Sequence, residues 1–567
     1  MSRCCSPKPK SASIRSMPAD CLKRLRRTGS MMSSVAIAAN CSRNWTQSRK
    51  KAHNRSAPVR AGSAQETGND MLRSLFLLIL IATPMVFIVF TPFVGVLLWT
   101  WISSMTPHRL TYGFLYDAPI VYAIALVTLA SLILRNEIKH VPRHPLVVLT
   151  GFYVAWSGLT TIFALEPDLA FTGWVDMLKV TALAFATAAT LTSRRRLYLL
   201  ITMIGISFAY YGVKGGLFTL MTGGSFRALG APGSFMSGTN EYATVLLMAL
   251  PLFVWLARHA EWWMLRWMFR AAIPLSVIAI LGTQSRGALV ALLAMLGFIG
   301  LRQRRVMIGF IVLLLAAPVV WETMPANWRA RFSTISEYSE DASFMGRVTM
   351  WKAAARAAAD HPILGVGIDG WANPDFQAKY VPFGEQPREW HSIYFGNLAE
   401  NGFPGLFLFV CLLFLAILTC RSVHRAAAGY EGLRWAADLA LALQASLIGF
   451  AAVGLVLHFP MFDLYFQLIA ITAVLASMVA RVVSLERLER KNAGMSSPFT
   501  ERDGREENGE EGGKEPPEEP REEPQEEPGN ESPVPAFSPR LAHAEGGGSS
   551  RRAGGLVRSS SGRRKDA

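Results

Sequence analysis

The stretch IAILGTQSRGALVALLAM, residues 278–295, is apolar on both sides of a short polar turn that carries Arg286. About 20 apolar residues cross a bilayer as helix, so the runs 268–283 and 285–300 are short spans or one interrupted span. Each flank of this segment holds three arginines: Arg258, Arg266 and Arg270 before it, and Arg302, Arg304 and Arg305 after it. Basic loops stay on the cytoplasmic side. The segment is therefore expected to cross twice, with Arg286 at an outer turn.

The rest of the chain is similarly apolar. Of its 567 residues, 51% are hydrophobic and 17% are charged, which is too apolar for a soluble enzyme of this length. The first apolar run contains Pro84 and Pro92, so it is expected to kink or break. The sequence predicts an all-α polytopic membrane protein with about twelve spans: 74–101, 117–134, 145–164, 173–192, 197–217, 241–257, 268–283, 285–300, 305–321, 403–420, 435–457 and 464–483.

The loops between these spans alternate in charge. Five loops hold three basic residues each. The short loops between them hold at most one lysine or arginine: Arg109 in 102–116, Arg227 in 218–240, and none in 165–172 or 458–463. This alternation places both termini in the cytoplasm. The large connection 322–402 is then outside; it contains an Ala-rich helical stretch stopped by Pro362, and the glycine-rich turn LGVGIDGW.

Both ends of the chain have unusual composition. Residues 1–70 hold 14 lysines and arginines against three acidic residues, which is most of the formal net charge of +16; this arm is expected to be disordered. Met71 opens MLRSLFLLIL, so the arm is either a mistranslated upstream segment or a cytoplasmic extension. Residues 485–567 are rich in Glu and Pro and predict a flexible cytoplasmic tail. Nucleic acid is not an expected partner, because the rest of the chain is only mildly basic.

Three arginines on the predicted outer side stand out as candidate site residues. Arg286 either snorkels to lipid headgroups or clamps phosphate oxygens, which guanidinium binds bidentately. Arg227 lies in a glycine- and serine-rich loop and is either solvated or a second phosphate ligand. Arg347 is four residues from Trp351, so the two share a helix face. Asn240 stands where the loop 218–240 becomes helix and is equally an ordinary N-cap.

Two further side chains are candidates for proton transfer. His391 precedes span 403–420, and on a helix it would share a face with Tyr394 and Phe395, with Gly402 ending that helix. It is either an interfacial histidine or a general base, because imidazole titrates near neutrality. Glu400 could serve as base or orient other groups. No metal site is expected, because no cluster of histidines and carboxylates has a recognisable ligand spacing.

Four motifs in series resemble the O-antigen ligase and polymerase superfamily of bacterial membrane glycosyltransferases: GTQSRGA at 282–288, GRVTMWKAA at 346–354, HPILGVGIDGW at 361–371 and HSIYFGNLAENGFPG at 391–405. The likeness covers about 200–480. Residues 71–200 look like the N-terminal region of the O-glycosylation ligase branch associated with exosortase systems. The chain reads SGTN at 237–240, where the family has Asn-Pro-Asn, and this weakens any function given to Asn240.

The resemblance implies a GT-C-like helical enzyme of the bacterial inner membrane that needs no cofactor or metal. Such an enzyme transfers a glycan from undecaprenyl pyrophosphate to an acceptor hydroxyl of a glycan, lipid or protein on the outer face. Carried over, Arg227 and Arg286 hold the pyrophosphate, His391 activates the acceptor, and Arg347 and Glu400 shape the site. The expected domains are an N-terminal membrane region at 71–200 and a catalytic membrane domain at 201–484.

Two alternatives remain open. A polysaccharide polymerase of the same superfamily would use the growing glycan as its acceptor, and the sequence does not distinguish it from a ligase. A transporter or flippase is expected to carry charges near the middle of its spans. Here Lys214 and Asp176 are the rare exceptions in otherwise apolar spans, so a transferase is favoured.

Overall fold

A computed structural model of the chain describes residues 68–492, apart from 112–113, 303–306, 309–310, 312–314, 316–341 and 459–460. The described residues form helices and no strand, which confirms the predicted all-α polytopic membrane protein. Within them, nine helices are long and apolar enough to cross a membrane: α3 (Gly68–Ile88), α6 (Pro145–Ile162), α7 (Pro167–Thr190), α8 (Arg194–Met221), α9 (Thr239–His259), α10 (Trp263–Gly282), α16 (Ile393–Ala428), α17 (Arg434–Val453) and α18 (Asp463–Asn492).

Three shorter apolar helices complete the set: α4 (Pro92–Met105), α5 (Ile120–Leu134) and α11 (Arg286–Gly300). Together these elements cover the predicted spans except 305–321, most of which lies outside the described residues. The arm 1–67 and the tail from 493 onward also lie outside them, as does the beginning of the large connection up to 341.

The first predicted span is broken, as its prolines indicated. Helix α3 ends at Ile88, and α4 begins at Pro92 after an extended Thr91. The break leaves backbone carbonyls without helical partners. Ser131 Oγ donates to Ile88 O at 2.6 Å, and Arg135 Nε donates to Val89 O at 3.1 Å. Ser131 of α5 and Arg135, which follows α5, therefore supply hydrogen-bond donors to the carbonyls at the break.

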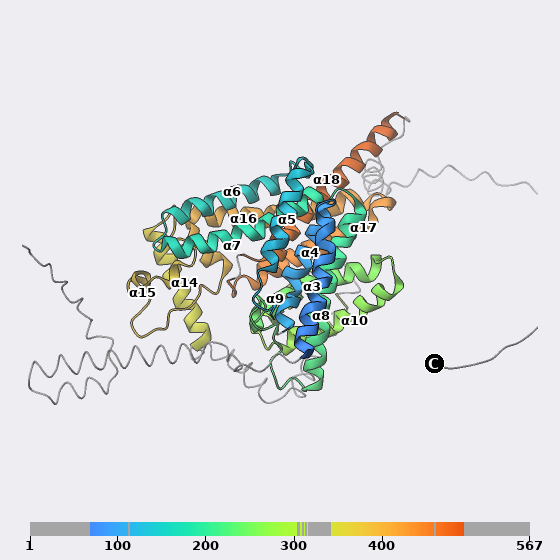
Figure 1. Ribbon diagram of the computed structural model, residues 1–567. Coiled ribbons are helices and arrows are strands. Elements are labelled where there is room, and N and C mark those ends of the chain that lie inside the picture. Colours follow the sequence, from blue (N-terminus) through green and yellow to red (C-terminus); the bar gives the residue numbers. More distant parts are fainter. Residues whose placement is uncertain are drawn as a thin grey trace, which may run out of the picture. The chain divides into compact units, whose positions relative to one another are not determined.

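Helices α9 and α17 pack on each other and are the most buried candidate spans of the described bundle (Figure 1). In their most apolar windows, 83% of α9 and 78% of α17 is buried, against 22% of α3. Helix α10 packs on α8 and α9, whereas α11 packs on α17 and α9. The two arms on either side of the Arg286 turn thus join different neighbours and do not form a close hairpin.

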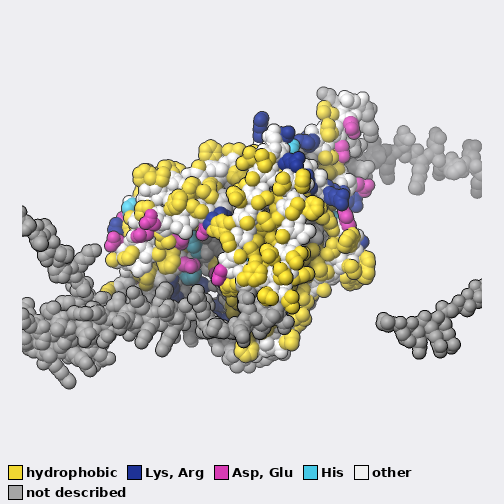
Figure 2. Space-filling view, viewed as in Figure 1, with side chains coloured by type: hydrophobic (Ala, Val, Ile, Leu, Met, Phe, Trp, Pro, Cys, Tyr) yellow, Lys and Arg dark blue, Asp and Glu magenta, His cyan; other side chains and the backbone are white. Residues whose placement is uncertain are grey.

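Loops predicted to share a side of the membrane contact one another. At the basic end, His259 Nε2 lies 2.7 Å from Asp438 Oδ2, and the Arg194 guanidinium lies 4.8 Å from the centre of the Trp435 ring. At the other end, Leu165 N donates to Val366 O at 3.1 Å, which ties loop 165–172 to the large connection. Figure 2 shows hydrophobic side chains over most of the visible face, with lysines and arginines gathered along one edge.

The large connection contains α14 (Ala342–Asp360) and α15 (Pro374–Tyr380). Helix α14 ends just before Pro362, as predicted. Between the two helices, the glycine-rich turn packs against α16 where that helix is interrupted at Gly402 (φ 66°, ψ −173°). Val366 N donates to Ala399 O at 2.7 Å and Gly367 N donates to Glu400 O at 3.1 Å. The turn therefore takes up carbonyls that the interruption deprives of helical partners.

Candidate active site

Arg286 is the first residue of α11 and follows a tight turn from the end of α10. Gln284 adopts a left-handed backbone conformation (φ 56°), and Ser285 is the N-cap, accepting from Ala288 N at 3.3 Å. The helix N-terminus carries partial positive charge and unsatisfied N–H groups. The turn therefore combines a permanent cation with a helix end that favours anions.

Asn240 belongs to the same turn. Ser285 Oγ donates to Asn240 Oδ1 at 2.7 Å, which joins the beginning of α9 to the beginning of α11. Gly238 is the N-cap residue of α9, and Asn240 lies inside the helix. The interpretation of Asn240 as an ordinary N-cap is therefore wrong, and the side chain instead positions the turn that carries Arg286.

Arg227 lies in the loop that covers this turn. The loop is held by Ala228 N, which donates to Gly282 O at 2.9 Å, and by Gly224 O, which accepts from Gln284 Nε2 at 3.1 Å. Arg227 itself is exposed. The backbone thus brings Arg227 beside the turn, and its function in binding an anion stays a prediction.

His391 is not on a helix, because α16 begins at Ile393 with Ser392 as its N-cap residue. The expected shared helix face with Tyr394 and Phe395 is therefore wrong. His391 has a left-handed backbone (φ 49°), which costs free energy for a residue with a Cβ and is found at functional sites. Burial, and then the positive charges of Arg347, His458 and Arg388, lower the pKa of His391 to about 4.

The α14 residues singled out by the sequence lie beside His391. Trp351 Nε1 donates to Trp390 O at 3.1 Å, and the Trp351 ring stacks on Phe395 at 5.4 Å between centroids. Arg347, one turn earlier on α14, acts electrostatically on His391. The structure therefore confirms that Arg347 and Trp351 share a helix and brings both to the segment that carries His391.

Glu400 is buried, with 2% of its side chain exposed, and its carboxylate has several partners. Trp390 Nε1 donates to Oε1 at 2.7 Å, and Asp369 N donates to the same oxygen at 3.2 Å. His458 Nε2 lies 3.4 Å from that oxygen. A buried carboxylate with these partners is better suited to orient neighbouring side chains than to act as a base that substrate can reach.

His458 was missed by the sequence analysis, although it stands in a short loop that was predicted to lie on the outer side and has few polar side chains. Its Nδ1 lies 3.3 Å from Ser392 O, which can only accept, so Nδ1 carries a proton. Burial alone would lower the pKa of His458, but the Glu400 carboxylate and the bond to Ser392 O raise it. His458 thus links Glu400 to the residue that follows His391.

A single short segment, residues 454–458, joins the two halves of the site. At one end of the contact, a Cβ added to Gly287 would lie 2.5 Å from Val456 Cγ2. At the other, Ile393 N donates to Gly454 O at 2.9 Å. The turn that carries Arg286 and the segment that carries His391 therefore both contact residues 454–458, which we call the bridging segment.

The arrangement offers cations, a neutral imidazole and an oriented carboxylate. Such a set suits transfer of a group from an anionic leaving group, because guanidinium groups stabilise charge that develops on departure. No group of three histidine, cysteine, aspartate or glutamate side chains suited to a metal ion occurs among the described residues.

Comparison with known families gives two matches. Residues 271–410 match the O-antigen ligase family, and residues 72–261 match a family of unknown function (DUF5935). No curated protein matches the chain. The first match includes Arg286, Arg347, His391 and Glu400 and confirms the resemblance to the O-antigen ligase superfamily. His458 lies beyond both matches, and the exosortase-associated branch stays a prediction.

Proposed function

We propose that this multi-pass membrane protein, which carries an O-antigen ligase domain at residues 271–410, transfers a glycan from undecaprenyl pyrophosphate to an acceptor hydroxyl. The acceptor is a glycan, a lipid or a protein on the outer face of the bacterial inner membrane. The observation that supports this proposal most is the bridging segment, because it contacts both the turn that carries Arg286 and the segment that carries His391.

In the proposed step, the acceptor oxygen attacks the anomeric carbon of the glycan. A new carbon–oxygen glycosidic bond forms while the bond from the anomeric carbon to the phosphate oxygen breaks. The proton of the acceptor hydroxyl passes to His391, and the electron pair leaves with the pyrophosphate. Arg286, the N-terminus of α11 and Arg227 stabilise that developing charge.

The low pKa of His391 matters for this step. An imidazole with a pKa of about 4 is neutral at physiological pH and free to accept a proton, but it is a weak base. Part of the shift comes from the charge of Arg347. Arrival of an anionic pyrophosphate would offset that charge and raise the pKa of His391, so that the base strengthens when substrate is bound.

Two alternatives give different products. A polymerase would join repeat units to a growing lipid-linked glycan and produce long chains that still carry the carrier. A transporter or flippase would move glycan without forming a glycosidic bond. The polar residues of the candidate site lie in loops or near helix ends, as Arg286 and His391 do, rather than in the middle of the long apolar helices, which favours the transferase. The division into domains at 71–200 and 201–484 is part of the same proposal.

The test is complementation of a deletion strain. We expect the deletion to accumulate lipid-linked glycan and to remove sugar from one species: lipopolysaccharide, exopolysaccharide or a protein band. Wild type restores transfer, whereas Arg286→Ala and His391→Ala are expressed normally and do not. Arg356→Ala, an exposed arginine of α14, is the matched control and should complement. Normal glycan profiles in the first two variants would refute the proposed mechanism.

A further inference from the structure

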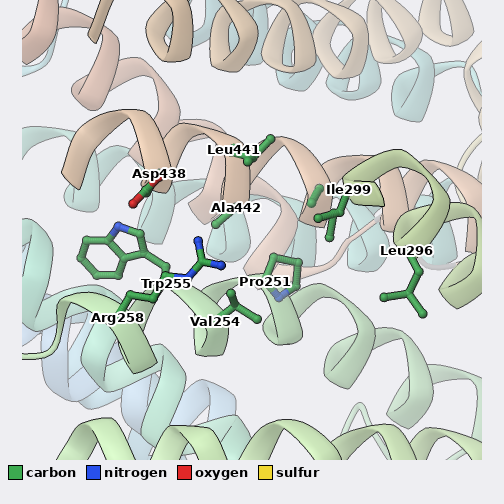
Figure 3. Close-up of a pocket in the computed structure, with 10 residues that line it drawn as sticks. Pro251, Val254, Trp255, Arg258, Leu296, Ile299, Asp438, Leu441 and Ala442 are labelled. Carbon is green, nitrogen blue, oxygen red and sulfur yellow. The ribbon is translucent and has the colours of Figure 1, made fainter. Parts of the chain in front are cut away.

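Two adjoining cavities lie at the opposite end of the bundle from the candidate active site. The first, of about 200 Å³, lies between α9, α11 and α17. Most of its lining is apolar, including Val254, Leu296, Ile299 and Ala442 (Figure 3). We call it the apolar groove. Arg258 and Asp438 stand at its polar end, where Figure 3 shows Asp438 beside the Trp255 ring.

The second cavity, of about 440 Å³, continues from that polar end. Arg194, Arg195, His259 and Trp435 line it, with Glu261 as its one carboxylate. Trp255 lines both cavities, so they share a wall. We call the second cavity the basic pocket. The carboxylate of Asp438 could repel an anion, but it pairs with His259, whose Nε2 lies 2.7 Å from Asp438 Oδ2.

The two cavities together match one kind of molecule. A pocket with two arginines suits a phosphate group, because guanidinium binds phosphate oxygens and keeps its charge. A neighbouring apolar groove suits a hydrocarbon chain. Tryptophan and tyrosine side chains at the junction are typical of the depth at which lipid headgroups meet acyl chains.

We propose that this site binds an anionic phospholipid of the surrounding bilayer, with its phosphate in the basic pocket and one acyl chain in the apolar groove. Basic pockets between membrane helices on the cytoplasmic side commonly hold anionic headgroups. The lipid would fasten α9 and α11 to α17 beneath the candidate active site. The proposed lipid site is distinct from the site of the proposed glycan carrier. The two sites lie at opposite ends of α9, and a helix of 21 residues is about 30 Å long.

The phosphate half of the proposal is tested by native mass spectrometry of the purified full-length chain. The protein is extracted from vesicles containing equal amounts of phosphatidylglycerol and phosphatidylcholine, and the retained lipids are counted. We expect wild type to retain phosphatidylglycerol selectively. Arg194→Gln with Arg195→Gln should reduce that retention by about tenfold, because each lost cation weakens binding of an anionic headgroup.

A matched control is available on α10. The guanidinium of Arg270 lies 4.7 Å from the Trp267 ring centre, much as Arg194 lies 4.8 Å from that of Trp435, but Arg270 lines neither cavity. Arg270→Gln should therefore retain lipid as wild type does. Equal loss in both variants, or no loss in either, would overturn the phosphate assignment.

The acyl half is tested by filling the groove. Val254→Trp places a large side chain in the apolar groove, whereas Val410→Trp changes an apolar residue of similar exposure on α16. We expect only the first to reduce retained phosphatidylglycerol. Inorganic phosphate at millimolar concentration should not displace the lipid, and displacement would assign the pocket to a free anion instead. Unchanged gel-filtration profiles show that each variant is folded.

Discussion

Replacement of Glu400 by glutamine isolates the charge at the centre of the buried network. The amide is nearly the same size and its oxygen can still accept from Trp390 Nε1 and Asp369 N, which lie 2.7 and 3.2 Å from Oε1. The attraction to His458, whose Nε2 is 3.4 Å away, is lost. The substitution therefore tests the ion pair with little change in packing.

The size of the effect follows from this geometry. At 3.4 Å and an effective dielectric constant of about 20, two unit charges attract by about 5 kcal/mol. Removing one partner of a buried pair typically costs about 3–5 kcal/mol. His458 can avoid that cost by losing its proton, so the cost depends on pH. About 1 kcal/mol should remain at high pH, because Trp390 then donates to a neutral amide rather than to a carboxylate.

The sign follows from the raised pKa of His458 in the folded protein. The stabilisation is fully present below the unfolded pKa of about 6.5 and is lost as pH rises through the folded pKa. We expect Glu400→Gln to lower the free energy of unfolding by about 3 kcal/mol at pH 6, and by less, towards about 1 kcal/mol, as the pH rises through the folded pKa of His458.

Thermal unfolding of the detergent-purified chain, followed by tryptophan fluorescence, measures this difference. The control is Glu431→Gln, which removes an exposed carboxylate 3.0 Å from Arg434 and should have little effect at either pH. A destabilisation by Glu400→Gln of only about 1 kcal/mol at pH 6 as well as at pH 9 would refute the reasoning, because it would show that His458 carries no charge in the folded protein.

Two further predictions concern the positions of the cationic and basic groups. Replacing Arg347 by methionine removes the largest charge acting on His391; the acid limb of kcat/KM should move to higher pH by about one unit, whereas Arg356→Met on the exposed stripe of the same helix should leave it in place. Asn240→Ala removes the acceptor of the Ser285 hydroxyl and should reduce glycan transfer about fivefold, as measured in membranes with normal amounts of protein; unchanged transfer would show that this bond does not position the turn.

The sequence predicted those features that depend on local pattern and composition. Apolar length gave the spans, and the prolines of the first span indicated its break, because proline removes a helical hydrogen bond. The position of Arg286 at the beginning of a helix followed from the loop charges on either side of 268–300. These features need no knowledge of which helices become neighbours.

The features that the sequence did not predict depend on contacts between distant segments. His458 is 58 residues from Glu400 along the chain, and no local pattern pairs them. Asn240 looked like an N-cap because it stands where a loop becomes a helix, but its partner Ser285 comes from another helix. His391 looked helical because the residues after it are, whereas its left-handed backbone follows from the turn into α16.

The interruption of α16 explains why the glycine-rich turn is needed at this site. A buried carboxylate at position 400 requires donors, and a continuous helix would supply none to its side chain. The break at Gly402 opens α16 to the turn, and Gly365 (φ 69°) lets the turn approach so closely that an added Cβ would lie 2.5 Å from Ala399 O. The turn then delivers Asp369 N to the Glu400 carboxylate. Its glycines thus serve close approach to a helix, and they fix the carboxylate that orients His458.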